Sequence, residues 1–344
     1  MKWLVAVAAL MFACRGHSGA PAQGSAGSAV ASAGSAVAGS AAAGSAHDPW
    51  AAGSNDPWAG EPSGSDDGAP TLEERHRLAE AACPRVTGPY FFRIEKAGKT
   101  SFILGTRHVG VPLTKFPQVV RDTIDHARLA VFEVAPDDDA NIKRPAMDLA
   151  AALGATDWQK YVELVGETTA DLVRHGRPDT ATIEMMVEYE DISATLDLEI
   201  EHEVAAHHIP ARGLETAAFQ DDLLDKLIDV RSLKVEVEQT KDRAELEQNS
   251  HDDLAEYCAG TDEEPGTDAK DREHMLAGGY TNAEIDHIDD VMVFQRNAKW
   301  IPQLEKLFAD GGVFVAVGAD HLIGDKGVIA LLRKRGFTAT RVTQ

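Results

Sequence analysis

Two short apolar runs, each ended by a glycine and followed three residues later by a histidine, constrain the fold of this chain most strongly. The first occupies residues 102–109 and contains Gly105 and His108. The second occupies residues 313–322, with Gly318 and His321 in the same relation. A continuous apolar run of this length that stops at glycine is typical of a buried strand followed by a loop. Because parallel α/β sheets bind ligands beyond the carboxyl ends of their strands, we expect both histidines to converge on one crevice.

The first 14 residues have the pattern of an export signal. Lys2 precedes an apolar stretch over residues 3–13, which suits a secretory signal and is too short to span a bilayer as a helix. Cys14 follows a small residue, as in a bacterial lipoprotein signal whose cysteine becomes lipidated, although the bulky Phe12 departs from that pattern. Cleavage near Ala20 without lipidation is the alternative. Both routes predict export, and the first predicts a lipid anchor in a bacterial cell envelope, at the outer membrane or in the periplasm.

Residues 15–70 differ from the rest of the chain in composition. Gly, Ser and Ala recur throughout, and large apolar side chains are scarce. Such a segment cannot bury enough surface to offset the entropy of ordering its backbone, so we expect a disordered linker. The folded domain is therefore expected at residues 71–344.

Charge and cysteine content exclude several classes of function. A formal net charge of -23 argues against nucleic acid, whose binding requires Lys and Arg to neutralise phosphates. It also argues against docking of the body on an anionic membrane, which leaves the N-terminal lipid as the expected membrane contact. Cys83 and Cys258 could pair in an oxidising compartment or remain separate thiols, and two cysteines are too few for a thiolate zinc site.

Strand and helix patterns alternate along the folded part, which predicts an α/β fold with a mainly parallel sheet flanked by helices. Glu133 and Glu215 each stand near the end of a predicted strand, and a helix opened by a capping box at Thr281 carries Arg296 and Asn297. The predicted segments are a hairpin at residues 90–104, a helix at 116–126, strands at 129–134 and 209–216, a helical insertion at about 137–208, a helical region at 217–255, a helix at 325–335 and a strand at 338–342.

The ordered set of these motifs resembles the TraB/PrgY/GumN family, which includes the Tiki metalloproteases and is distantly related to the erythromycin-esterase and ChaN-like proteins. No single motif is specific, but the set appears in the family's order over roughly residues 90–344. The residues that carry the resemblance are Gly105-Thr-Arg-His108, Phe132-Glu-Val134, Gly213-Leu-Glu-Thr216 with Gln220, Arg296-Asn297, and Gly318-Ala-Asp-His-Leu322 with Gly324, Gly327 and Gly336.

The resemblance implies a metal-dependent hydrolase that acts on a peptide or another small substrate. His108 and His321 would be ligands of a divalent metal ion such as Mn, Co or Zn, and Glu133 and Glu215 would complete the metal site or act as general base. Arg296 would stabilise an oxyanion or bind a substrate carboxylate, with Asn297 as a hydrogen-bonding neighbour. One departure is Thr106, which stands where distant relatives carry a glutamate.

Other interpretations of the same residues remain open. A metal-independent esterase would use His108 as a base, and a non-catalytic ligand- or haem-binding lipoprotein would use the same crevice without turnover. A third alternative is a non-catalytic partner of another envelope protein. Zinc binding by the His202-Glu-Val-Ala-Ala-His207 stretch is not expected, because a zincin motif needs its second histidine at position 206 and His207 lies about 140° from His202 around a helix.

Overall fold

The computed structural model describes residues 68–138, 142–261, 266–267 and 269–343. The predicted signal with Cys14 and the predicted linker up to residue 67 lie outside the described residues. The helices are α2 (Leu72–Ala82), α3 (Gln118–Asp125), α4 (Leu149–Leu153), α5 (Ala155–Val173), α6 (Pro178–Val187), α7 (Leu196–Ala206), α8 (Ala217–Leu227), α9 (Val230–Gln239), α10 (Arg243–Ala259), α11 (Ala269–Ala277), α12 (Asn282–Asp289), α13 (Gln295–Phe308) and α14 (Val328–Lys334). The strands are β1 (Phe91–Lys96), β2 (Lys99–Thr106), β3 (Leu129–Val134), β4 (Ala211–Glu215), β5 (Val313–Gly318) and β6 (Thr338–Arg341).

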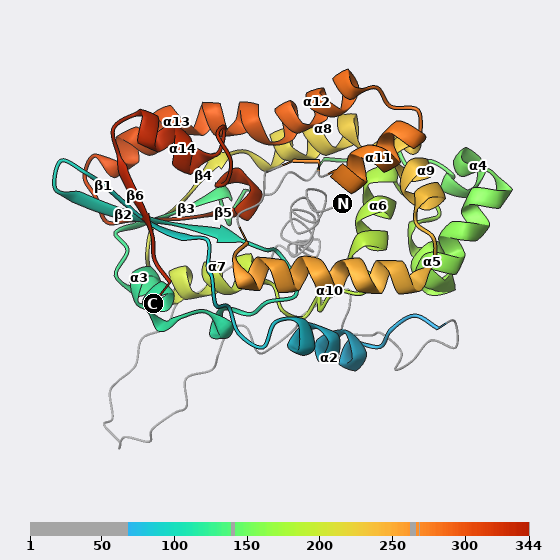
Figure 1. Cartoon of the computed structure of the whole chain (residues 1–344), viewed down its shortest axis with the longest axis horizontal. Helices are drawn as coiled ribbons and strands as arrows, with labels where there is room; N and C mark the ends of the chain where they lie inside the picture. The colour runs from blue at the N-terminus through green and yellow to red at the C-terminus, as the bar shows by residue number, and fades with distance from the viewer. Residues whose placement is uncertain (1–67, 139–141, 262–265, 268, 344) are drawn as a thin grey trace, which may run out of the picture. The chain divides into compact units, whose positions relative to one another are not determined.

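One mixed sheet organises the described part of the chain, in the order β4-β3-β5-β2-β1-β6 (Figure 1). Four strands, β4, β3, β5 and β2, run parallel to one another. β1 and β6 are antiparallel additions at one side. β1 turns directly into β2 at Ala97 and Gly98, which both have positive φ, as a tight hairpin turn requires. The predicted α/β class is thus confirmed, and the parallel part of the sheet is the part that carries the candidate site residues.

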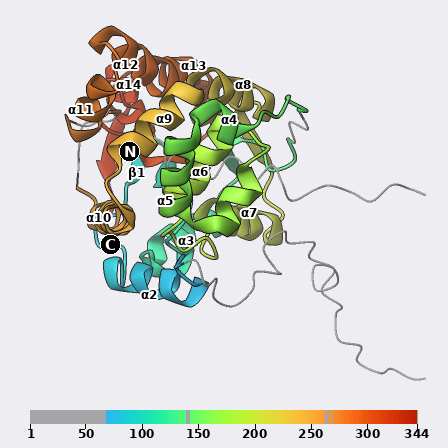
Figure 2. The same ribbon diagram turned by 90° about the vertical axis from the view of Figure 1, so that its right-hand side faces the viewer.

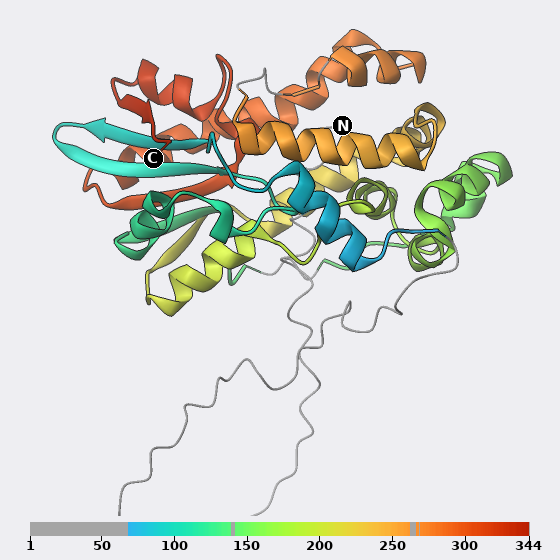
Figure 3. The same ribbon diagram turned by 60° about the horizontal axis from the view of Figure 1, so that its bottom comes forward.

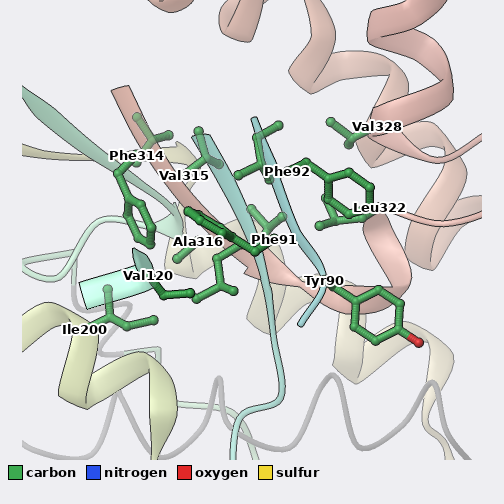
Figure 4. Close-up of a cluster of buried hydrophobic side chains, with 14 of the residues drawn as sticks. Tyr90, Phe91, Phe92, Val120, Ile200, Phe314, Val315, Ala316, Leu322 and Val328 are labelled. Carbon is green, nitrogen blue, oxygen red and sulfur yellow. The ribbon is translucent and has the colours of Figure 1, made fainter. Parts of the chain in front are cut away.

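Helices cover both faces of this sheet. In Figures 1 and 3, α13 and α14 lie on one side of the strands, and α3 and α7 lie on the other. Their apolar faces form one core with the strands, in which Phe91 and Phe314 are completely buried (Figure 4). Ile103 is also completely buried in this core. Fully burying a side chain of this size stabilises the fold by roughly 1.5–3 kcal/mol. This core holds the strand ends in fixed positions.

Most of the predicted helical insertion forms a separate group beyond the carboxyl ends of the strands, whereas its last helix, α7, packs on the sheet. α4, α5 and α6 pack with α9 (Figure 2) around a second core that includes Tyr161, Met185 and Leu233. In Figure 1 the arrowhead of β2 points towards α6. The helical region predicted at residues 217–255 consists of three helices, because Asp229 and Asp242 each cap the start of a new one.

A disulfide fastens the first described helix to the body. Cys83 at the C-terminal end of α2 is bonded to Cys258 on α10, which decides between the two states that the sequence left open. Arg75 of α2 also forms a buried ion pair with Glu188, at 3.2 Å. Within the described ranges, no helix combines the length and apolar character needed to cross a bilayer.

Candidate active site at the carboxyl edge of the parallel strands

The two glycine–histidine loops leave neighbouring strands at the same level of the sheet. β2 and β5 are paired in parallel, with Thr106 opposite Gly318. His108 follows two residues after Thr106, and His321 follows three residues after Gly318. Both imidazoles are buried. The paired register therefore brings both predicted loops to one edge of the sheet.

The absence of a side chain at Gly105 lets the two loops approach each other closely. A Cβ atom on Gly105 would lie 2.9 Å from the Cα of Ala319 and 3.0 Å from Leu322 Cδ1, both in the second loop. A Cβ atom essentially never approaches another heavy atom within 3.0 Å, so a larger residue at this position would push the backbone of Ala319 away. On the other side, the Tyr257 hydroxyl of α10 donates a hydrogen bond of 2.8 Å to the Gly105 carbonyl.

Glu133 lies beside the second loop, near the end of β3. Its Oε1 accepts a hydrogen bond of 2.8 Å from the backbone N–H of Gly318. Its Oε2 accepts bonds of 2.6 Å from Arg296 Nη2 and 3.0 Å from Gln220 Nε2. His321 Nε2 is 3.7 Å from Oε1. This carboxylate therefore touches the second loop, the helix α13 and the helix α8 at once.

Arg296 joins Glu133 to Glu215, which ends the adjacent strand β4. Its Nε donates a 2.7 Å bond to Glu215 Oε1, its Nη2 contacts both glutamates, and its Nη1 donates to the Met292 carbonyl at 2.9 Å. Glu215 Oε2 accepts a 3.2 Å bond from Trp300 Nε1. A guanidinium has five N–H donors, so these bonds leave Arg296 at most one for a substrate. The contacts favour a role in fixing the two carboxylates over the predicted role in binding substrate.

Asn297 orients the ring of His321. Its Oδ1 accepts a bond of 2.7 Å from His321 Nδ1, and its Nδ2 donates to the Lys326 carbonyl at 3.1 Å. The carbonyl can only accept, which fixes the amide orientation and places the ring proton on Nδ1. The Trp300 ring packs beside the imidazole, with centroids 4.4 Å apart. Asn297 is fully buried, and these contacts favour a positioning role over the predicted contact with substrate.

Asp197 orients the ring of His108, as Asn297 orients the ring of His321. Asp197 lies in the first turn of α7, and its Oδ2 is 2.5 Å from His108 Nδ1. Since a carboxylate can only accept, the ring proton of His108 is on Nδ1. The residue before it, Arg107, forms a buried ion pair of 2.6 Å with Glu190. Both bonds fix the first loop against the helical insertion.

The protonation states follow from burial and from neighbouring charges. Burial alone would raise the pKa of Glu133, whereas Arg296 lowers it, and smaller contributions from both histidines and the Gly318 N–H bring it to about 2. Burial lowers the pKa of His321 to about 3, with Glu133 opposing this change and Arg296 and His108 adding to it. At neutral pH the site therefore holds an ionised Glu133 and a neutral His321.

The helix that carries Arg296 and Asn297 is preceded by a π-helical turn. This turn spans Asp290–Phe294, directly after α12 and directly before α13. π-Turns insert one extra residue into a helix and are frequent at functional sites. Here two adjacent residues, Arg296 and Asn297, are both buried and both serve the site, while Gln295 beside them is exposed.

The donor chemistry of His108, His321 and Glu133 suits the divalent metal ion that the resemblance implies. Metal-bound histidines use one ring nitrogen and donate the other N–H to a carboxylate or carbonyl, and both histidines are held in this way through Nδ1. Glu133 and Glu215 both accept hydrogen bonds at each of their oxygens, so hydrogen bonding does not distinguish the two as ligands. Among the described residues, the four predicted ligands do not bring three ligand atoms within 4.8 Å of one another.

A comparison with protein families gives the identification. The model of the TraB/PrgY/gumN family matches residues 90–341 of this chain. The chain belongs to this family. No curated protein and no solved structure matches it. The matched range begins just before β1 and ends with β6, so it includes all the strands and every residue of the site.

Nothing in the sequence singles out Asp197. Gln220 belongs to the residues that carry the family resemblance, but the sequence predicts no role for it. Gln220 donates to both Glu133 and Glu215, at 3.0 and 2.8 Å. Asp197 stands on a helix with several other acidic residues, so its type and spacing are not distinctive. Only the fold places it beside a histidine that is 89 residues away in the sequence.

Proposed function

We propose that this member of the TraB/PrgY/GumN family is an exported hydrolase that cleaves an amide or ester bond with His108, His321 and Glu133. The observation that carries the proposal is the matched attachment of two buried imidazoles through Nδ1, on paired strands, beside an ionised glutamate. Nε2 is then the reactive nitrogen of each ring. Such a set of neutral imidazole and carboxylate supports hydrolysis.

Of the predicted ligands, His108 and His321 would hold a divalent metal ion of the Mn, Co or Zn class. Glu133 is left to accept a proton, because the three residues do not bring their ligand atoms within 4.8 Å of one another. When bound, such an ion supplies a water molecule of lowered pKa and polarises a carbonyl oxygen. Glu215, by contrast, serves the site through Arg296. It keeps the guanidinium in place and thereby keeps Glu133 ionised.

The chain's own residues have distinct tasks in this proposal. Glu133 Oε1 accepts the proton of the attacking water, because it carries one hydrogen bond, from the Gly318 N–H, whereas Oε2 carries two, from Arg296 and Gln220. Asn297 and Asp197 hold the two rings in the orientation that the reaction needs. Arg296 offsets the negative charge of the two neighbouring carboxylates, Glu133 and Glu215.

The test is hydrolysis of a peptide library and of nitrophenyl esters by protein purified without chelator. His108→Ala and His321→Ala should each lower the rate at least about 10³-fold while circular dichroism stays unchanged. His287→Ala, an exposed histidine of α12, is the matched control and should leave the rate unchanged. Elemental analysis of the same samples should show one transition-metal ion fewer per chain in each site variant than in the wild type.

Two results would overturn the proposal. Turnover that survives in both site variants would place the chemistry elsewhere. A stoichiometric bound ligand or haem without turnover would favour a binding protein. Activity that persists after chelation and is lost in His108→Ala would retain the hydrolase and remove the metal.

Export and lipid attachment are the second part of this proposal. The apolar stretch before Cys14 supports it, as does the Cys83–Cys258 disulfide, because disulfides persist mainly in oxidising compartments. Expression in bacteria with a radiolabelled fatty acid should label the wild-type chain in the membrane fraction. Cys14→Ser should be unlabelled, and an unlabelled wild type would leave only export by ordinary cleavage.

A further inference from the structure

Three side chains away from the active site form a group with the composition of a metal site. Asp125 ends α3, and Glu203 and His207 lie one turn apart at the end of α7. One ligand atom from each lies within 4.8 Å of the other two. Of the residues that the structure describes, these three form the one His/Cys/Asp/Glu group with that spacing. All three are exposed, so an ion from solution can reach them.

The distances between these atoms suit a shared ion better than a direct ion pair. His207 Nε2 lies 3.3 Å from Asp125 Oδ1 and 3.7 Å from Glu203 Oε2. A charge-assisted hydrogen bond between such atoms has a length of roughly 2.7–2.9 Å. Metal–ligand bonds of 2.0–2.2 Å in tetrahedral geometry separate neighbouring ligand atoms by about 3.3–3.6 Å. The observed separations are close to the second range.

The charges of the group also favour a cation. Two carboxylates approach each other here, within 4.8 Å of the imidazole nitrogen. No lysine or arginine forms an ion pair with Asp125 or Glu203 among the described residues. A divalent ion would neutralise both carboxylates, and the Glu203/His207 pair at i, i+4 presents two donors from one helix face.

We infer that Asp125, Glu203 and His207 form a second, solvent-accessible divalent metal site of the zinc class, which joins the C-terminal ends of α3 and α7. Imidazole with two carboxylates is a zinc-type ligand set, and the fourth position is left to water. The ion cross-links the two helices that cover one face of the sheet. The zincin pattern that starts at His202 does not contribute, since His202 lies on another side of α7.

Zinc titration calorimetry on full-length protein, freed of metal with a chelator and then dialysed, tests this inference. His207→Ala should bind one zinc ion fewer than wild type, or bind it at least ten-fold more weakly, and Glu203→Gln should weaken the same event. His202→Ala, an exposed histidine on the same helix, is the matched control and should bind as wild type does. The increase in melting temperature caused by zinc should be larger for the wild type than for His207→Ala.

Repeating the titration in a His108→Ala/His321→Ala background separates this site from the active site. The remaining zinc binding should then disappear on adding His207→Ala. Equal stoichiometry and affinity in wild type and His207→Ala would overturn the inference, and so would an equal loss in His202→Ala. His207→Ala is also compared directly with the wild type. The test therefore remains valid even if the His108→Ala/His321→Ala variant does not fold.

Discussion

The two glycine–histidine loops have nearly the same sequence pattern, yet the protein surrounds them differently. His321 is held by the neutral amide of the fully buried Asn297 and packs against Trp300. His108 is held by the carboxylate of Asp197, whose side chain is 23% exposed. One ring is thus anchored inside the core, and the other is anchored near the surface by a charge.

This difference indicates a division of labour between two similar residues. A neutral amide and deep burial disfavour imidazolium, so His321 stays neutral over a wide range of pH. An adjacent carboxylate stabilises a positive charge on its imidazole and makes the other nitrogen more basic. We therefore expect His108 to be the ring that can gain charge during a reaction, and His321 the ring that keeps one state.

The largest effect is expected from Arg296→Met, which changes the surroundings of His321 because Arg296 binds the neighbouring Glu133. The variant leaves Glu133 and Glu215 buried without their shared guanidinium, which should cost about 3–5 kcal/mol in the free energy of unfolding. Urea denaturation at pH 7 measures it. Arg93→Met, which removes an exposed pair with Glu95, is the control and should cost under about 1 kcal/mol. Equal losses in the two variants would show that burial does not distinguish them.

A smaller loss is expected when the two anchors are made alike by Asn297→Asp. The new carboxylate would face the Lys326 carbonyl without a donor, which should lower the free energy of unfolding by roughly 2–3 kcal/mol. It should also raise the pKa of His321 from about 3. NMR titration of the ring checks the second effect. An unchanged His321 pKa would remove the basis for the contrast between the loops.

The reverse change, Asp197→Asn, should affect activity more than stability. Because the Asp197 side chain is partly exposed, the free energy of unfolding should fall by less than about 1 kcal/mol. Loss of the charged partner of His108 should lower the hydrolysis rate or the metal affinity by roughly 10–100-fold. Rate assays and urea denaturation on the same samples separate the two. A stability loss large enough to account for the lost activity would contradict a positioning role.

The smallest effect concerns Glu201, one turn after Asp197 on α7. Burial, with the charge of Asp197 adding to it, raises the pKa of Glu201 to about 7. Because the folded state binds the proton more tightly, this contribution to stability is complete below about pH 4.5 and is lost as the pH rises through about 7. Glu201→Gln should therefore stabilise the protein at pH 8 by roughly 1–2 kcal/mol, and change little at pH 4.5. Urea denaturation at both values checks the sign.

Much of this arrangement could be predicted from sequence because strand ends are marked locally. Glu133 stands near the end of an apolar strand, Glu215 ends a short strand after a turn to β structure, and Thr281 with Glu284 forms the predicted capping box. Parallel pairing then brings strand ends to one edge, which is why the two predicted histidine loops meet. The predicted roles of Arg296 and Asn297 were less secure, since a residue type shows which bonds are available and not which partners take them.

The rest depends on contacts between elements that have no common local pattern. Asp197 reaches His108 only because the helical insertion returns α7 to the sheet, where the start of the helix meets the loop that follows β2. The three-residue group on α3 and α7 is invisible for the same reason. Asp125 is far from Glu203 and His207 in the sequence and carries no distinguishing neighbour.

The π-turn at Asp290–Phe294 sets the register of α13, and therefore decides which residues of that helix face the interior. Removing one residue from it would rotate everything after it by about 100° around the helix axis. The guanidinium and the amide at positions 296 and 297 would then leave the interior and be replaced by whatever neighbour the new register brings inward. We therefore expect relatives to accept insertions and deletions in the loops around this helix, and to reject a single-residue change of length within it.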